Sequence, residues 1–297
     1  MRPDLEWLNS IWQEGATGHR RVGQQELSLL ARGTFVAGLI DSLTLPNESR
    51  AELINTLESA ESFAHQLKDD ELRIDVVSHS LLLNGNERRK VGDYDGSEYF
   101  LSKAESWAAN GHLWRRKAEI AGLLCYVQAA RDDIYRLRAS LERSEAALHQ
   151  AGDEEGIEIA AGGTGGSVFD MVSIAEVKLR CALMTRDRIW MKQICRDTPS
   201  CLSGNYHWEL YYSLTRGAAQ LYLRESEGID WLRRARDIGV RVGAVSQLQR
   251  VLMAAYEYES IESTTLADQV RGDLEALHSG HLPPSRRMAQ SLQQNLF

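Results

Sequence analysis

A glycine-rich segment is the first part of this chain whose residue types and spacing could do chemistry. Residues 160–170 read AAGGTGGSVFD and place their glycines just before a predicted helix. Backbone N–H groups at such a position can hold phosphate. A phosphate-binding loop also needs Gly-Lys followed by Ser or Thr, and this segment contains no lysine. We therefore interpret it as a connector between two halves of the chain.

Two acidic clusters could hold magnesium in an all-helical enzyme. They are Asp69-Asp70-Glu71 and Asp132-Asp133. Adjacent carboxylates on a helix point in different directions, and neither cluster is followed by a third carboxylate at a suitable spacing. Asp132 and Asp133 are better explained by a helix N-terminus, where negative charge is favourable. These clusters therefore predict helix starts rather than a metal site.

Histidine and cysteine spacing also argues against a metal site. The eight histidines form no HExxH or similar pattern. The cysteines, Cys125, Cys181, Cys195 and Cys201, form no CxxC pair and indicate neither a disulfide framework nor zinc. A nucleophilic site assembled from distant residues stays open. We expect no cofactor and no metal, and we expect binding rather than catalysis.

Composition and charge narrow the class of protein. The 297 residues are 43% hydrophobic and 26% charged, as in ordinary folded proteins. A net charge of -8 disfavours broad attraction to nucleic acid or acidic membranes. No apolar run reaches membrane-spanning length, and the N-terminus does not resemble a signal peptide. We expect a cytoplasmic protein that binds neither nucleic acid nor membrane.

The elements that must position any site are predicted to be helices. The five prolines fall near expected boundaries, and the intervals between them are rich in helix-favouring residues. No convincing series of alternating strand segments occurs. Helices are predicted near residues 5–14, 24–42, 48–67, 71–90, 94–110, 114–130, 133–151, 167–184, 188–196, 206–224, 227–242, 245–259, 264–278 and 285–295.

One stretch shows how these helices pair. Residues 81–108 cannot form a single helix, because Gly92-Asp93 interrupts the apolar pattern. Two helices and a tight turn fit instead. Small residues at Gly85, Ser97 and Ala104 would let the helices approach closely, while leucines fill the space between them.

With Gly85 at the signature glycine, residues 78–111 resemble a tetratricopeptide repeat, a helix-turn-helix unit of about 34 residues. The sequence departs from the signature at Asn84, Arg88 and Ala109. Weaker echoes occur in residues 122–153 and 215–239. The resemblance implies an all-α chain, a right-handed α-solenoid of antiparallel helix pairs. We divide it into an N-terminal helical segment (1–76), tetratricopeptide-like pairs (77–161), a second, degenerate group (167–259) and C-terminal capping helices (260–297).

The resemblance also implies a function. In that family the first helix of each pair lines a concave groove that holds an extended peptide or a partner helix. By the repeat register, five residues of this chain would face the groove: His79, Leu82, Asn86, Arg89 and Lys90. Asn86 is the most informative, because an amide can bond both the donor and the acceptor of a peptide backbone.

These observations predict a non-catalytic adaptor or regulatory module that binds a protein or peptide partner. Homo-oligomerisation stays open. One alternative is a ligand-gated sensor or regulator of signalling or transcription, and another is an all-helical enzyme with a central acidic cavity. Convergent inward-facing carboxylates would support the enzyme, whereas a continuous open groove without them would support the adaptor.

Overall fold

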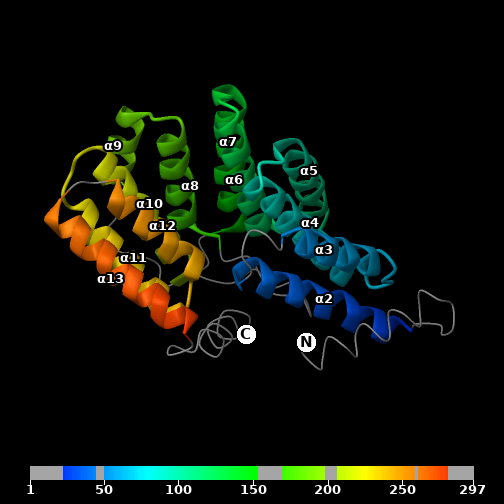
Figure 1. The fold of residues 1–297 in the computed structure, drawn as a ribbon. Coiled ribbons are helices and arrows are strands. Elements are labelled where there is room, and N and C mark those ends of the chain that lie inside the picture. Colours follow the sequence, from blue (N-terminus) through cyan, green and yellow to red (C-terminus); the bar gives the residue numbers. More distant parts are fainter. Residues whose placement is uncertain (1–22, 45–49, 153–168, 198–205, 258–259, 280–297) are drawn as a thin grey trace. The chain divides into compact units, whose positions relative to one another are not determined.

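The computed structural model describes residues 23–44, 50–152, 169–197, 206–257 and 260–279 (Figure 1). Over these residues the protein consists of twelve α-helices with no strand, which confirms the predicted all-α class. The helices are α2 (Gln24–Thr44), α3 (Arg50–Ala64), α4 (Asp70–Lys90), α5 (Tyr94–Asn110), α6 (Trp114–Ala130), α7 (Ile134–Ala151), α8 (Met171–Met184), α9 (Arg188–Asp197), α10 (Tyr206–Tyr222), α11 (Gly228–Val242), α12 (Val245–Tyr256) and α13 (Ile261–His278).

The helices form two compact units. The first takes in the described residues up to Ile120, and the second takes in those from Ala121 onward. Helix α6 runs without a break through this division and contributes to both units. The sequence boundary that we set at residues 76 and 77 lies inside α4, which packs against both α3 and α5. The glycine-rich connector, the first and last predicted helices and Cys201 lie outside the described residues.

One turn geometry recurs between consecutive helices. At each such turn a residue takes a positive φ, and the next residue donates its N–H to the carbonyl five positions earlier. In the turn after α4, for example, Gly92 has φ 83° and Asp93 N–H bonds to Arg88 O at 3.0 Å. This arrangement caps the preceding helix as a Schellman motif. The positive-φ residues of the six turns are Gly92, His112, Asp132, Arg186, Arg224 and Gly243.

Aspartate starts several helices directly after this turn. The carboxylates of Asp93 and Asp133 accept the N–H groups of Gly96 at 2.9 Å and Arg136 at 3.0 Å. A side chain that satisfies an otherwise unpaired N–H stabilises the helix start. Asp69 caps α4 in the same way. The acidic clusters are therefore helix starts, as predicted.

The α4–α5 pair packs as its sequence predicts. A Cβ at Gly85 would lie 2.7 Å from Leu101 Cγ, so only glycine fits this helix contact. Ser97 and Ala104 are fully buried on the facing helix, and Leu81 fills the space beside them. In the first unit α3 also packs on α2 and α4.

In the second unit alternate helices lie side by side. Helix α10 packs against both α8 and α12, while α11 packs on α10 and α12 (Figure 1). Its main core forms between α10, α11, α12 and α13, around Leu232, Leu248 and Val270. Counting from α4, we call α4, α6, α8, α10 and α12 the first helices and the helices that follow each of them the second helices.

Candidate functional site

The five residues predicted to line a groove all lie on α4. Leu82 is only 2% exposed and belongs to the core, so its side chain is not offered to a partner. Asn86 accepts a hydrogen bond from Arg89 Nη2 at 2.8 Å, and Lys90 Nζ lies 2.5 Å from Glu87 Oε1. The C-terminal end of α4 therefore carries Asn86, Arg89 and Lys90, whose side chains make hydrogen bonds or ion pairs with neighbours on the same helix. That these residues bind a partner stays a prediction.

His79 lies in a different environment from the other four. Its ring is mostly buried, with its centroid 4.5 Å from that of Phe35 on α2. Burial, together with the charge of Arg116, lowers the pKa of His79 to about 3. Arg116 in turn donates to Asp75 Oδ1 at 2.5 Å and to Ser78 Oγ at 2.9 Å. His79 is thus held neutral beside a buried ion pair that ties α6 to α4.

Two departures from the repeat signature are partners of each other. Arg88 Nε donates to Asn84 Oδ1 at 2.8 Å, and its Nη1 donates to Asp93 Oδ2 at 2.9 Å. The same guanidinium reaches Glu58 on α3 at 3.0 Å and lies 4.7 Å from the Phe100 ring centroid. Arg88 therefore binds three helices of the first unit together.

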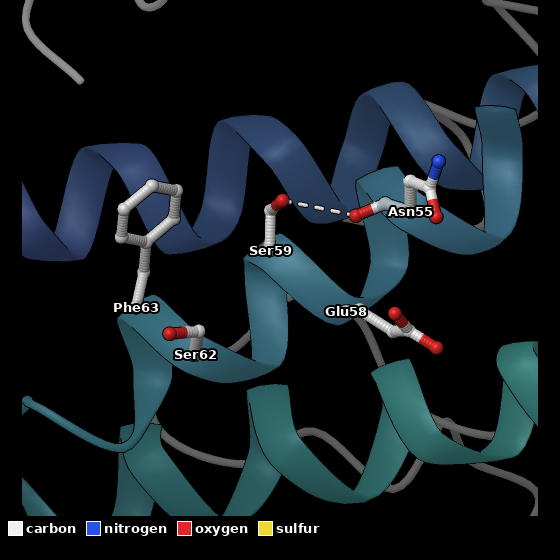
Figure 2. A pocket seen from close by; sticks show the side chains of 5 residues that line it. All are labelled: Asn55, Glu58, Ser59, Ser62 and Phe63. Carbon is white, nitrogen blue, oxygen red and sulfur yellow. Dashed lines mark hydrogen bonds between the residues drawn. The ribbon is translucent and has the colours of Figure 1, made fainter. Parts of the chain in front are cut away.

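A shallow hollow of about 320 Å³ lies along α3 (Figure 2). Its lining residues are Asn55, Glu58, Ser59, Ser62 and Phe63. Figure 2 shows one hydrogen bond among them, from Ser59 Oγ to the Asn55 carbonyl at 2.9 Å. All five residues belong to a single helix, so no polar groups converge on the hollow from opposite sides.

Polar side chains do converge in the second unit, where four first helices each contribute. We call this set the α6–α12 polar cluster. Hydrogen bonds, an ion pair and cation–π contacts connect its members, although they span much of the sequence. Its residues are Tyr126 on α6, Glu176 and Arg180 on α8, Tyr211 and Thr215 on α10, and Gln247 and Arg250 on α12.

Glu176 is the central carboxylate of the cluster and has no exposed surface. It accepts hydrogen bonds from the Tyr126 hydroxyl and from Thr215 Oγ1, the latter at 2.8 Å, and it forms an ion pair with Arg180. A buried carboxylate is tolerated only when it is paired and hydrogen-bonded in this way. Burial and the neighbouring Glu176 raise the pKa of Tyr126, so the phenol donates as a neutral group.

Arg180 lies between two tyrosine rings. Its Cζ is 4.8 Å from the Tyr126 ring centroid and 5.5 Å from that of Tyr211. Burial opposes charge on this guanidinium, but Glu176 and the two tyrosines outweigh it and raise the pKa of Arg180. Arg180 therefore remains a fixed positive charge held by cation–π contacts and one carboxylate.

Arg250 approaches the same Tyr211 ring at 6.0 Å. Burial and the positive charge of Arg180 lower the pKa of Arg250 to about 10. Across the described part of the chain this guanidinium has no hydrogen bond or ion pair, only its contact with the ring. Gln247 Nε2 fixes the ring itself by donating to Tyr211 Oη at 2.6 Å. The cluster thus holds more positive than negative charge.

No sequence motif marks this cluster. Tyr211 belongs to the aromatic run NYHWELYY, residues 205–212, in which Trp208 and Tyr212 are core residues and Tyr211 is half-buried. The usable signal was Glu176 four residues before Arg180 in the largely apolar helix MVSIAEVKLRCALM. A charged pair at that spacing within apolar neighbours indicates a buried ion pair.

The one carboxylate of the cluster is occupied by neighbouring donors. Among the residues that the structure describes, no group of three or more His, Cys, Asp or Glu gathers as metal ligands would. Cys125, Cys181 and Cys195 are buried thiols. None of the described helices combines the length and the apolar character needed to cross a membrane. No model of a known protein family matches the chain, and no curated protein matches it either.

Proposed function

We propose that the protein is a non-catalytic interaction module, a right-handed α-solenoid of tetratricopeptide-like helix pairs that binds a peptide or helix of a protein partner. The partner would lie along the first helices, in the cytoplasm. The recurring turn supports this arrangement, because the same cap geometry follows α4, α6, α8 and α10 and so reverses the chain repeatedly in the same way.

The observation that carries the proposal is the packing of α8, α10 and α12. These first helices lie side by side and present Arg180, Tyr211 and Arg250 together. Arginine and tyrosine are favoured at the centres of protein interfaces, where they combine apolar contact with directed hydrogen bonds. A row of first helices bearing such residues is what a helical-repeat module needs to recognise a peptide or a helix.

The test compares the wild-type protein with two charge-reversed variants in quantitative affinity capture from native extract. Arg89→Glu changes the exposed end of a first helix, α4. Arg138→Glu, the matched control, changes an exposed arginine on the second helix α7. Circular dichroism verifies that both variants fold.

We expect a partner whose recovery falls at least about tenfold with Arg89→Glu and stays at the wild-type level with Arg138→Glu, because reversal of a contacting charge costs more than about 1.4 kcal/mol. Equal recovery with both variants would remove α4 from the binding surface. Failure of all three proteins to capture any partner above the empty resin would count against the adaptor and favour a small-molecule sensor.

A further inference from the structure

We propose that Arg180 and Arg250, which both approach the Tyr211 ring, form a binding site for an oxyanion, a carboxylate or a phosphate group. The site belongs to the α6–α12 polar cluster of the second unit. It goes beyond the proposed function, since it concerns one charged group and holds whether that group belongs to a polypeptide or to a small molecule.

The charge count of the cluster is the first argument. Two guanidinium groups approach Tyr211, at 5.5 Å for Arg180 and 6.0 Å for Arg250. Glu176 is the one carboxylate of the cluster, and it already serves Arg180, Tyr126 and Thr215. Glu176 also favours the charge of Arg250, but its ion pair is with Arg180, so Arg250 has no carboxylate in direct contact among the described residues.

Arg250 is buried close to a second positive charge, and this is the second reason for the proposal. Withdrawal from water and the nearby Arg180 both work against its charge, as its lowered pKa shows. Interactions between charges are stronger in such surroundings than in bulk water. An oxyanion bound by both guanidinium groups would offset their mutual repulsion with two attractions, which makes the cluster selective for a negatively charged group.

Hydrogen-bond donors supply the third argument. The Nε of Arg180 is buried and has no acceptor among the described residues. Arg250 also donates to none of them. Guanidinium groups present their N–H donors as a planar fork that matches carboxylate and phosphate oxygens. The donors needed to hold an oxyanion are thus present and unused.

The site is also held in place before any ligand arrives. Gln247 fixes the Tyr211 hydroxyl at 2.6 Å, while Tyr126 is fixed by Glu176. Arg180 cannot leave without exposing the buried Glu176. Groups locked by neighbouring packing and hydrogen bonds lose little conformational freedom on binding, which favours affinity.

The experiment titrates the full-length protein with sodium phosphate and, separately, sodium acetate, with sodium chloride keeping the ionic strength constant. Isothermal calorimetry gives the affinity, and the shift in melting temperature checks it, because a ligand of the folded state stabilises that state. The variant is Arg250→Gln. The matched control is Arg188→Gln, an exposed arginine that lies 5.6 Å from the Tyr222 ring but outside the cluster.

We expect the wild-type protein and Arg188→Gln to bind at least one of the two anions, and Arg250→Gln to bind it at least about tenfold more weakly, since charged hydrogen bonds are lost. Binding of phosphate alone would identify a phosphoryl ligand, and binding of acetate alone a carboxylate. If Arg250→Gln does not fold, Arg250→Lys replaces it, and weakened binding is again expected because the planar fork is lost. Equal responses of all proteins, or no response beyond that to chloride, would overturn the proposal.

Discussion

Buried charges in this protein are single side chains whose neighbours decide whether they are tolerated. Asp75 and Glu176 have no exposed surface, and each is paired with an arginine. His79 differs from these carboxylates, because its ring is uncharged beside Arg116. Because removal from water is costly for any charge, a buried titratable group needs either a charged partner or a neutral state.

His79 gives a prediction in the acid range. The pKa of His79 is about 3 in the folded protein, below the ordinary value of 6.5. Between pH 3 and pH 6.5, His79 is therefore protonated in the unfolded chain and neutral in the folded protein. The stabilisation is complete above pH 6.5 and is lost as the pH falls. Relative to His79→Gln, the wild-type free energy of unfolding should fall by about 1.4 kcal/mol per pH unit between pH 6 and pH 4.

Urea unfolding at several pH values measures this difference. His65→Gln is the control, because the His65 side chain, directly after α3, is 45% exposed, and this variant should keep the wild-type slope. A His79→Gln protein with the same slope as the wild type would show that the ring is protonated in the fold as readily as in the unfolded chain.

At the scale of elements, the turns explain why helix boundaries could be predicted. The ranges expected for α5 and α6 agree with the structure, since Gly92-Asp93 and Gly111 punctuate the sequence there. Asp133 marked the start of α7, because its carboxylate accepts an N–H group of the first helical turn. The start of α8 was less well placed, although an aspartate caps it too. The predicted start of α8 at residue 167 lies outside the described residues, and α8 begins at Met171 behind the Asp170 cap.

Backbone strain at the positive-φ residue differs from one turn to another. Arg186 and Gly243 occupy equivalent positions, with φ of 56° and 72°. Only glycine adopts this conformation without steric strain. Arg186→Gly should therefore raise the free energy of unfolding by about 1 kcal/mol, whereas Gly243→Ala should lower it by a similar amount. Paired urea titrations measure both, and a loss of stability in Arg186→Gly would contradict the argument.

Close helix contacts give a second prediction at this scale. A Cβ at Gly217 in α10 would lie 2.9 Å from the Gly228 carbonyl oxygen of α11 and 2.7 Å from Leu232 Cδ2. Gly272 in α13 has nothing within 4 Å of such an atom. We expect Gly217→Ala to lower the melting temperature through a clash worth about 1–3 kcal/mol. Gly272→Ala, the same change in an open helix position, should raise it, since alanine favours helix by about 1 kcal/mol.

At the scale of the whole molecule, the all-α class could be predicted from composition and periodicity, but the polar cluster could not. Its residues run from Tyr126 to Arg250 and come from four helices. Local periodicity indicates which face of a helix is apolar, yet it does not indicate which helices become neighbours. The five residues on α4 were predicted to line a groove because the repeat signature fixes their spacing, and this stays a prediction, whereas no signature marks Arg180 or Arg250.

The two units share α6, and this sharing predicts how local unfolding spreads. The N–H groups of residues 121–124 bond to carbonyls of residues 117–120, which belong to the first unit. Leu81→Ala should destabilise the first unit by about 3 kcal/mol. Hydrogen exchange at residues 121–124 should then quicken at least about tenfold, while exchange in α11 should not change. Unchanged exchange at 121–124 would mean that α6 stays helical when the first unit opens.

Because α6 is continuous, insertions and deletions within it are restricted. Each residue inserted into an α-helix rotates everything beyond it by about 100° around the helix axis. One codon added near Ile120 would therefore turn Tyr126 and its neighbours away from the face they now occupy, relative to Arg116 and the residues before it. A codon added at the turn around Gly111 meets no such angular constraint. Changes in length should therefore accumulate between helices and be excluded from the middle of this one.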